Sequence, residues 1–233
     1  MGYITTEYIN TLSKNKPSIF IETGTFKGGV PQMMIEDGTF NQWKKVYTIE
    51  LNEDMCKIAS KRYSLYEAGK PFDRDTDEKD ETFNGRKEFF GGKLVLVQGD
   101  SSQKLKDILT EIDEPCVFWL DAHAGAKEGY ARGEVDCPLI QELESISEHS
   151  VKNHIITIDD ASLFGIVERK DGEVVCDYSD ITKEKIESIL SNINPELSTF
   201  YPAPFNQPML VSLVKDREID NTIKSSDWWN QVK

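Results

Sequence analysis

The chain has 233 residues, and its 41 acidic against 27 basic side chains give a formal net charge of −14. Hydrophobic residues make up 38% and charged residues 29%, which excludes a collagen-like, disulfide-scaffold or wholly disordered chain. A pI near 4.7 argues against nucleic acid and against a membrane surface as partners, because both are bound through clustered lysine and arginine. With no apolar run long enough to span a bilayer and no visible secretory signal, we expect a cytoplasmic protein.

Six short apolar runs have the length and the β-branched or aromatic content of strands. They span residues 18–23, 45–51, 93–98, 116–121, 154–159 and 209–214. Most are apolar on both faces, which is typical of strands buried between two layers of helices. A further strand is expected at residues 198–202.

Helical patterns alternate with these runs. Leucine and isoleucine recur at helical spacing within residues 103–112, 139–146 and 186–193, and Asn52 is placed to begin another helix. An amphipathic helix is expected within residues 1–17. This alternation predicts an α/β domain with a mainly parallel sheet. The strands at 198–202 and 209–214 are joined by a connection too short for a crossover helix, which predicts that they are antiparallel.

Three segments interrupt the alternation. Residues 66–92 form a polar loop insertion whose acidic run lacks the spacing and central glycine of an EF-hand calcium loop. Residues 161–180 hold a hairpin signal at Lys170–Gly172. Residues 216–233 form a polar tail whose two tryptophans, Trp228 and Trp229, pack either onto the domain or onto another copy in a homo-oligomer. The four cysteines (Cys56, Cys116, Cys137 and Cys176) lack zinc-site spacing and are expected to be free thiols.

Acidic residues stand at the ends of five of the expected strands. They are Glu22, Glu50, Asp100, Asp121 and the pair Asp159–Asp160. In an open parallel sheet, ligands bind beyond the carboxyl ends of the strands. The sequence therefore predicts a ligand site lined by acids.

The turn after the first strand, residues 22–29 (ETGTFKGG), is rich in glycine. It does not fit the dinucleotide fingerprint, because Phe26 stands where a glycine is needed, and it lacks the lysine motif of a P-loop. Glu22 beside this turn disfavours a pyrophosphate and favours a cationic ligand. Glu50 is placed to accept hydrogen bonds from ribose hydroxyls. Together these features point to a nucleoside ligand without phosphates.

The turn at 22–29, Glu50, the pair Gly99–Asp100 and the strand end FWLDAH at 118–123 resemble the successive motifs of class I S-adenosylmethionine-dependent methyltransferases. The resemblance covers about residues 18–215. It implies a Rossmann-like, doubly wound seven-stranded sheet, mostly parallel, with an antiparallel last strand. It also implies that residues 1–233 form a single methyltransferase domain.

The resemblance implies a set of cofactor-binding residues. Glu22 and Gly24 would lie under the methionine part with Gly28 closing the turn, Glu50 would hold the ribose, Asp100 and Ser101 would flank the adenine, and Asp121 would face the transferred methyl group. Thr23, Thr25 and Leu51 complete the set. An alternative for Asp100 is that it only caps the following helix.

Three of the acids are expected to converge as a metal site. Asp121, Asp159 and Asp160 repel one another unless a cation neutralises them, and hard oxygen ligands select ions such as Mg²⁺. The arrangement resembles metal-dependent O-methyltransferases that act on sugars or natural products, which implies Mg²⁺ held by these residues. The alternative is that Asp159 and Asp160 only form a cap or turn before Leu163.

His123 lies two residues past Asp121, where it suits the role of a general base at neutral pH. A structural histidine is the alternative; His149 and His154 are expected to be surface or structural. Residues 125–136 are expected to form an active-site loop in which Tyr130 and Arg132 contact the acceptor, with a plain solvated loop as the alternative.

These features predict an O-methyltransferase that moves a methyl group from S-adenosyl-L-methionine to a hydroxyl of a small molecule, a sugar or glycan, with help from a divalent metal. One alternative is a methyltransferase that acts without metal on a protein or another non-sugar acceptor. The other is a cofactor-binding protein without catalytic activity.

Overall fold

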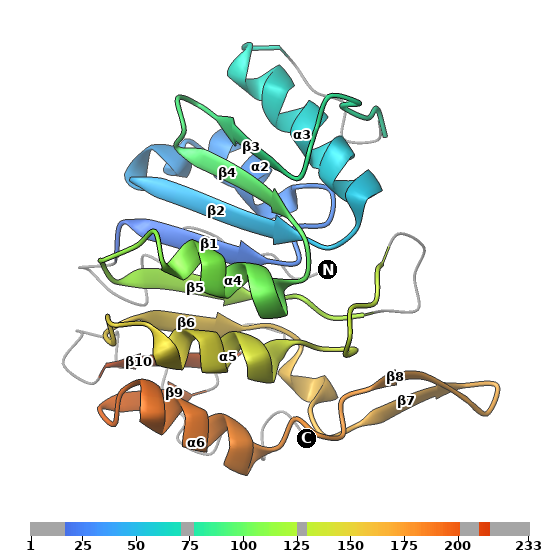
Figure 1. The fold of residues 1–233 in the computed structure, drawn as a ribbon, viewed down its shortest axis with the longest axis vertical. Coiled ribbons are helices and arrows are strands. Elements are labelled where there is room, and N and C mark those ends of the chain that lie inside the picture. The colour runs from blue at the N-terminus through green and yellow to red at the C-terminus, as the bar shows by residue number, and fades with distance from the viewer. Residues whose placement is uncertain (1–16, 71–76, 125–129, 201–209, 215–233) are drawn as a thin grey trace.

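The computed structural model describes residues 17–70, 77–124, 130–200 and 210–214 (Figure 1). Strands and helices alternate along most of the chain. Their order is β1 (Ile19–Thr23), α2 (Gly29–Glu36), η1 (Thr39–Gln42), β2 (Lys45–Glu50), α3 (Glu53–Glu67), β3 (Arg86–Phe89), β4 (Leu94–Gln98), α4 (Ser101–Leu109), β5 (Cys116–Leu120), α5 (Leu139–Glu148), β6 (Ile155–Ile158), η2 (Ala161–Leu163), β7 (Val167–Lys170), β8 (Glu173–Asp177), α6 (Lys183–Ile193), β9 (Leu197–Phe200) and β10 (Leu210–Val214).

The main sheet has the strand order β3-β4-β2-β1-β5-β6-β10-β9. Neighbours among β4, β2, β1, β5 and β6 are parallel, while β10 runs antiparallel to both β6 and β9. This confirms the predicted α/β fold with a mostly parallel sheet and an antiparallel end. The carboxyl ends of the five parallel strands therefore lie along one edge of the sheet.

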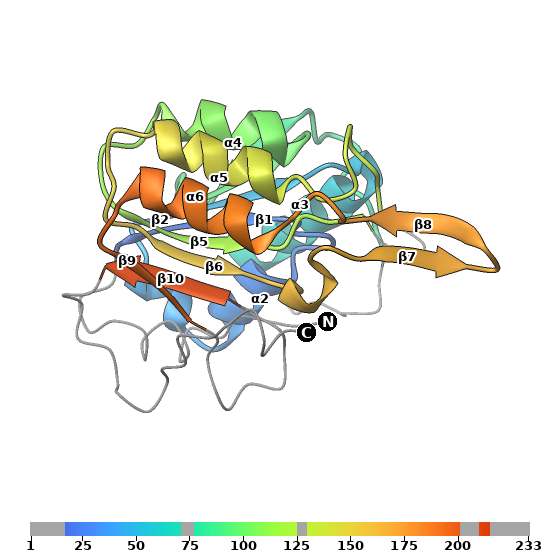
Figure 2. The same cartoon turned by 90° about the horizontal axis from the view of Figure 1, so that it is seen from below.

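Helices cover both faces of the sheet, as Figure 2 shows for α4, α5 and α6 on one side and α2 on the other. Alternate residues of β1 serve the two layers: Ile19 and Ile21 pack with α4–α6, and Phe20 packs with α2 and α3. All five residues of β1 and of β5 are buried. Apolar residues on both faces were the reason to expect strands between helices, and the packing follows from that pattern.

The prediction of seven strands is wrong, because the described residues alone form a sheet of eight. The additional strand, β3, lies inside the segment 66–92 that was expected to be only a polar loop, and it pairs antiparallel with β4 at the edge of the sheet. Its sequence, RKEF, carries three charged residues, of which Arg86 and Glu88 are exposed, and only its last residue, Phe89, is buried. An edge strand of this kind carries no apolar signal, since one side of it faces solvent.

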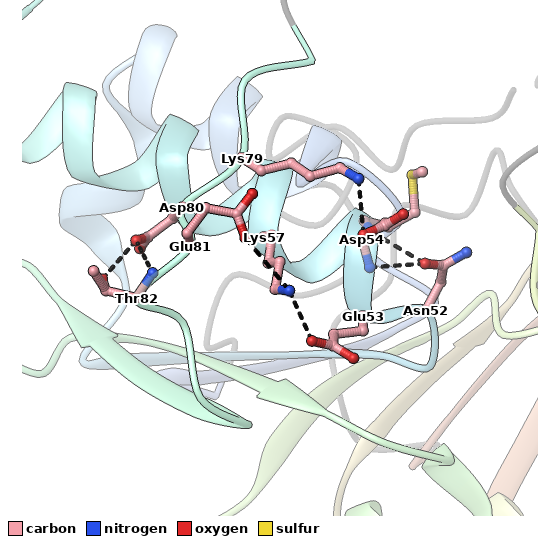
Figure 3. A network of polar contacts seen from close by, with 9 residues as sticks. Asn52, Glu53, Asp54, Lys57, Lys79, Asp80, Glu81 and Thr82 are labelled. Atoms are coloured by element: carbon pink, nitrogen blue, oxygen red, sulfur yellow. Dashed lines mark hydrogen bonds and ion pairs between the residues drawn. The ribbon is translucent and has the colours of Figure 1, made fainter.

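Much of the rest of this segment is tied to α3 by polar contacts (Figure 3). Asn52 caps α3 as predicted, because its side chain accepts hydrogen bonds from the N–H groups of Asp54 and Met55. Lys79 pairs with Asp54 at 2.8 Å, and Lys57 lies between Glu53 and Glu81. The acidic run is therefore matched by lysines in its described part.

The remaining predictions have mixed outcomes. The hairpin is confirmed as β7–β8, with positive φ at Asp171 and Gly172 in its turn. All four cysteines are free thiols. The expected helix within 1–17, the connection at 203–208 and the tail at 216–233 lie outside the described residues. Among the described helices, none has the length and apolar character to cross a membrane.

Candidate active site

Four of the predicted acids line one cavity at the carboxyl edge of the sheet. The cavity has a volume of about 230 Å³, and these four acids are Glu22, Glu50, Asp100 and Asp121, from the ends of β1, β2, β4 and β5; Asp136, from the loop before α5, is a fifth. Gly24, Thr25, Leu51 and Ser101 of the predicted cofactor set also line it, whereas Thr23 and Gly28 do not. The acids converge because their strands are neighbours in the sheet and parallel.

The glycine turn passes very close to the end of β5. Gly24 has φ +78°, and a Cβ at this position would lie 2.4 Å from the backbone oxygen of Asp121. Gly28 also has positive φ, and a Cβ there would meet the Tyr63 hydroxyl at 2.7 Å. Both glycines are therefore needed for the shape of the turn, although only Gly24 borders the cavity.

Glu22 is buried under this turn. Its Oε2 accepts hydrogen bonds from the hydroxyls of Thr25 (2.7 Å) and Thr48 (2.5 Å). Burial raises the pKa of Glu22 to about 7, against the lowering effect of these two hydrogen bonds. A carboxyl group held near its titration point in a buried cavity favours a cationic ligand, because a positive charge stabilises its ionised form.

Glu50 fixes the conformation of the turn. Its Oε2 accepts from the backbone N–H of Phe26, and its Oε1 accepts from the N–H of Asn52, both at 2.7 Å. Burial raises the pKa of Glu50. Phe26 has φ +51°, a strained conformation for a bulky side chain, and the hydrogen bond to Glu50 holds it there.

Asp100 caps α4, since its Oδ1 accepts from the N–H of Ser102 at 3.0 Å. The capping role weighed for this residue is confirmed. Its other oxygen faces the loop before α5, where a Cβ on Gly133 would lie only 2.3 Å from Oδ2. Because Asp100 also lines the cavity, capping leaves room for a contact with a ligand.

Asp121, His123 and Asp160 form a cluster at the end of the site where the reaction is expected. His123 Nδ1 lies 3.4 Å from Asp121 Oδ1, and His123 Nε2 lies 3.0 Å from Asp160 Oδ2. One ligand atom from each of the three residues lies within 4.8 Å of the others. Asp160 has φ +50°, and this left-handed turn follows directly after β6.

Asp159 faces a second, smaller cavity of about 20 Å³, which Asp121, His123 and Asp160 also line. Burial, followed by repulsion from Asp160, raises the pKa of Asp159 to about 6. Burial and the nearby Asp159 and Asp160 raise the pKa of Asp121 well above its usual range. These shifts show that the cluster is electrostatically unfavourable when all its carboxylates are ionised without a cation.

The loop expected to contact the acceptor is described from residue 130 on. Tyr130 lines the cavity, with its ring centroid 5.5 Å from that of Phe26 and 6.2 Å from that of His123. Arg132 does not line the cavity. Its Nε donates to Asp136 Oδ1 at 2.8 Å, and its guanidinium also contacts the carbonyl of Val175.

His149 and His154 are structural and buried, so the surface alternative for them is wrong. His154 Nδ1 accepts from the N–H of Cys116 at 3.0 Å, and His149 Nε2 lies 2.9 Å from the carbonyl oxygen of Ile112. The two rings stack at a distance of 5.3 Å between centroids. They take no part in the cavity.

Two charged residues on helices were missed in the sequence, and Asp136, which also lines the cavity, was not among the predicted site residues either. Arg62 of α3 lines the cavity and donates to the carbonyl oxygen of Lys27 at 3.0 Å. Glu142 of α5 is 1% exposed and lines the smaller cavity, and burial raises its pKa to about 7. Both were passed over because charged residues within helices normally face solvent, although the spacing of Glu142 from Leu139 and Ile146 places it on the buried stripe of α5.

No protein-family model and no curated protein sequence matches the chain. Among solved structures it is similar to the SAH-bound methyltransferase PaMTH1 of Podospora anserina (14% identity, 85% of this chain and 72% of that chain covered, TM-score 0.48). It is also similar to SMU.1697c of Streptococcus mutans in complex with SAH (13%, 89% and 94%, 0.46) and to an rRNA methylase of Streptococcus thermophilus (12%, 91% and 91%, 0.41). Because these sequence identities and TM-scores are low, the chemistry has to be judged from the residues of the site itself.

Proposed function

We propose that the protein is an S-adenosylmethionine-dependent O-methyltransferase that acts on a hydroxyl of a small molecule, a sugar or glycan, with assistance from a divalent metal. The observation that carries this proposal is the larger cavity at the carboxyl edge of the sheet, where Glu22, Glu50, Asp100 and Asp121 meet from four strand ends. These four acids and a glycine turn without a phosphate-binding motif suit a ligand that is a nucleoside, carries hydroxyls and amines, and bears a positive charge.

The cofactor assignment follows the order of the strands. Glu22 and Gly24 support the methionine part, Glu50 accepts from the ribose hydroxyls, and Asp100 with Ser101 contacts the adenine. Both oxygens of Glu50 already accept a backbone hydrogen bond. Each still has a lone pair, so a ribose would add to these contacts without replacing them.

A divalent ion fits the donor set at the reaction end, because two carboxylates and an imidazole reach a common point. We assign Asp121, Asp159 and Asp160 as its ligands. Such an ion, when bound, lowers the pKa of a coordinated hydroxyl. With Asp159 as the third ligand, His123 is left to accept the proton of the acceptor. The residues whose ligand atoms converge are Asp121, His123 and Asp160, so the alternative arrangement has His123 as the third ligand.

The bound cofactor supplies an electrophilic methyl group on a sulfonium. Transfer forms an oxygen–carbon bond and breaks the carbon–sulfur bond, whose electron pair stays on sulfur. The residues of this chain orient the two reactants and exclude water, and His123 takes the hydroxyl proton. Before transfer, the acids of the cavity stabilise the positive charge of the sulfonium. This charge is lost in the reaction.

Titration calorimetry with S-adenosylhomocysteine tests the cofactor assignment. We expect binding of S-adenosylhomocysteine and no binding of NAD. The Asp121→Ala variant should bind S-adenosylhomocysteine nearly as well as the wild type and lose turnover with hydroxyl acceptors, while Asp107→Ala, on the exposed face of α4, should leave both unchanged. If the wild type does not bind S-adenosylhomocysteine, the proposed function is wrong.

The metal assignment has its own test. Excess chelator should abolish turnover, and Asp159→Asn should weaken the apparent metal affinity more than His123→Asn does. The reverse order would make His123 the third ligand. Turnover that survives chelator would favour the alternative, a metal-independent enzyme acting on a protein or another non-sugar acceptor, and S-adenosylhomocysteine binding without turnover of any acceptor would favour a non-catalytic binding protein. The charge of −14 supports an acceptor other than nucleic acid.

A further inference from the structure

One wall of the cavity consists of a segment without helix or strand. It belongs to the connection between β5 and α5, and its lining residues are Tyr130, Ala131, Gly133, Val135, Asp136 and Pro138. The segment spans the whole site: Gly133 lies against Asp100 at one end, and Tyr130 lies against His123 at the other. Its position therefore sets the shape of the cavity from the expected adenine end to the reaction end.

Asp136 makes three hydrogen bonds, one within this wall and two to residues outside it. Its Oδ1 accepts from Arg132 Nε at 2.8 Å, and its Oδ2 accepts from the backbone N–H of Asp177 at 2.7 Å. Its backbone carbonyl accepts from the N–H of Ala124 at 2.6 Å. The Asp136 side chain is 11% exposed, so its carboxylate is largely shielded from water, although the Arg132 side chain is 56% exposed.

The partner of Asp136 is the base of the hairpin β7–β8, which projects from the body of the fold (Figures 1 and 2). The Tyr178 hydroxyl, just after β8, donates to the carbonyl of Ala124 at 2.6 Å, and the Cys176 thiol contacts the same oxygen. Ala124 and Asp136, the two ends of the loop, are thus held both to each other and to one hairpin. The base of the hairpin therefore anchors both ends of the loop.

We propose that Asp136 is a positioning residue for the cavity, and that the base of the hairpin β7–β8 is the anchor through which it acts. The proposal rests on the proposed function for the identity of the ligand. Without Asp136 the wall is free to sample other positions, and binding then has to order it. The ordering cost appears as weaker binding, because only a fraction of the molecules has the competent shape.

Two variants of Asp136 and a matched control test this role with S-adenosylhomocysteine as the probe. Asp136→Ala should weaken its binding about 10-fold or more, measured by calorimetry well below the melting temperature. Asp136→Asn should have a smaller effect, since the amide oxygen still accepts from the N–H of Asp177. Glu134→Ala removes the same charge from the same loop at an exposed position that does not line the cavity, and its affinity should equal that of the wild type.

The outcomes separate this proposal from the proposed function. If the wild type and Glu134→Ala do not bind the probe, the proposed function fails. If they bind it and Asp136→Ala binds equally well, with or without a lower melting temperature, Asp136 has only a structural role and the proposal is overturned. Should Asp136→Ala fail to fold, Tyr178→Phe removes the bond at the other end of the loop. Tyr178→Phe should weaken binding of the probe several-fold. Unchanged affinity for the probe in both Tyr178→Phe and Asp136→Asn also overturns the proposal.

Discussion

Gly24 follows β1 directly and lies against the backbone of Asp121, just after β5. Its positive φ and its distance to Asp121 make two separate demands for glycine. Gly38 also has φ +78°, but nothing lies within 4 Å of a Cβ placed on it. Substituting Gly24 and Gly38 therefore separates the loss of stability caused by the backbone conformation from the loss caused by the close approach to Asp121.

We expect Gly38→Ala to lower the free energy of unfolding by about 1 kcal/mol, from the left-handed conformation alone. Gly24→Ala should lower it by about 3 kcal/mol and should also abolish S-adenosylhomocysteine binding, because the turn has to move away from Asp121. Urea unfolding and calorimetry measure the two effects. Equal destabilisation of the two variants would show that the contact with Asp121 is not restrictive.

Glu22 predicts a pH effect on stability. Its pKa is raised from 4.5 to about 7 by burial, so the unfolded chain ionises first as the pH rises. Wild-type stability should fall relative to Glu22→Gln between about pH 4.5 and pH 7, by up to about 3 kcal/mol, and the difference should then level off. Urea unfolding of both proteins at pH 5 and pH 8 measures the difference. A constant difference across this range would contradict the raised pKa.

At the scale of elements, α3 and the segment before β3 are joined by ion pairs of unequal value. Asp80 accepts from the Ser60 hydroxyl, from Lys87 and from Thr82, and its side chain is only 11% exposed. Burial alone would raise the pKa of Asp80, and these hydrogen bonds outweigh burial and lower it. Lys79, paired with Asp54, lies at the surface.

Asp80→Ala should therefore destabilise the protein by about 2 kcal/mol, since several donors lose their acceptor. Lys79→Ala should leave the free energy of unfolding nearly unchanged, because exposed ion pairs contribute little. Chemical unfolding at one pH near neutrality compares the two. A larger loss for Lys79→Ala would mean that the surface network of Figure 3 acts as a unit.

The elements also show where sequence patterns are informative and where they are not. The parallel strands were predicted because they are apolar on both faces. In the observed sheet their carboxyl ends lie side by side, which brings Glu50 and Asp121 into one cavity. β3 was missed because an edge strand needs no apolar residues. Glu142 was missed because it is charged, although its spacing puts it on the same buried stripe of α5 as Leu139 and Ile146. The contacts of Asp136 join segments 41 residues apart, and no local pattern encodes them.

At the scale of the whole molecule, the charge of −14 makes stability depend on ions in two ways. Added NaCl screens general repulsion and should raise the melting temperature. At equal ionic strength, MgCl₂ or MnCl₂ should raise it further by binding the folded state at Asp121 and Asp160. This excess should disappear in Asp160→Asn and persist in Asp171→Asn.

The two substitutions are matched, because Asp160 and Asp171 both have φ near +50°, a conformation that asparagine tolerates. Asp171 lies in the turn of the hairpin, away from the acid cluster. Thermal unfolding followed by circular dichroism is sufficient for the comparison. If the excess effect of the divalent ions is the same in both variants, these ions act only through general screening or at another site.

The strand β3 has a consequence for the protein in concentrated solution. Without it, the apolar strand β4 would be the last strand of the sheet, and its free N–H and C=O groups would offer a template for other chains. With β3 in place, that rim presents Arg86, Lys87 and Glu88 instead. Charged, short rims resist edge-to-edge growth into aggregates. The strand β3, which the apolar pattern did not predict, thus carries the charges that hinder this edge of the sheet from pairing with other molecules.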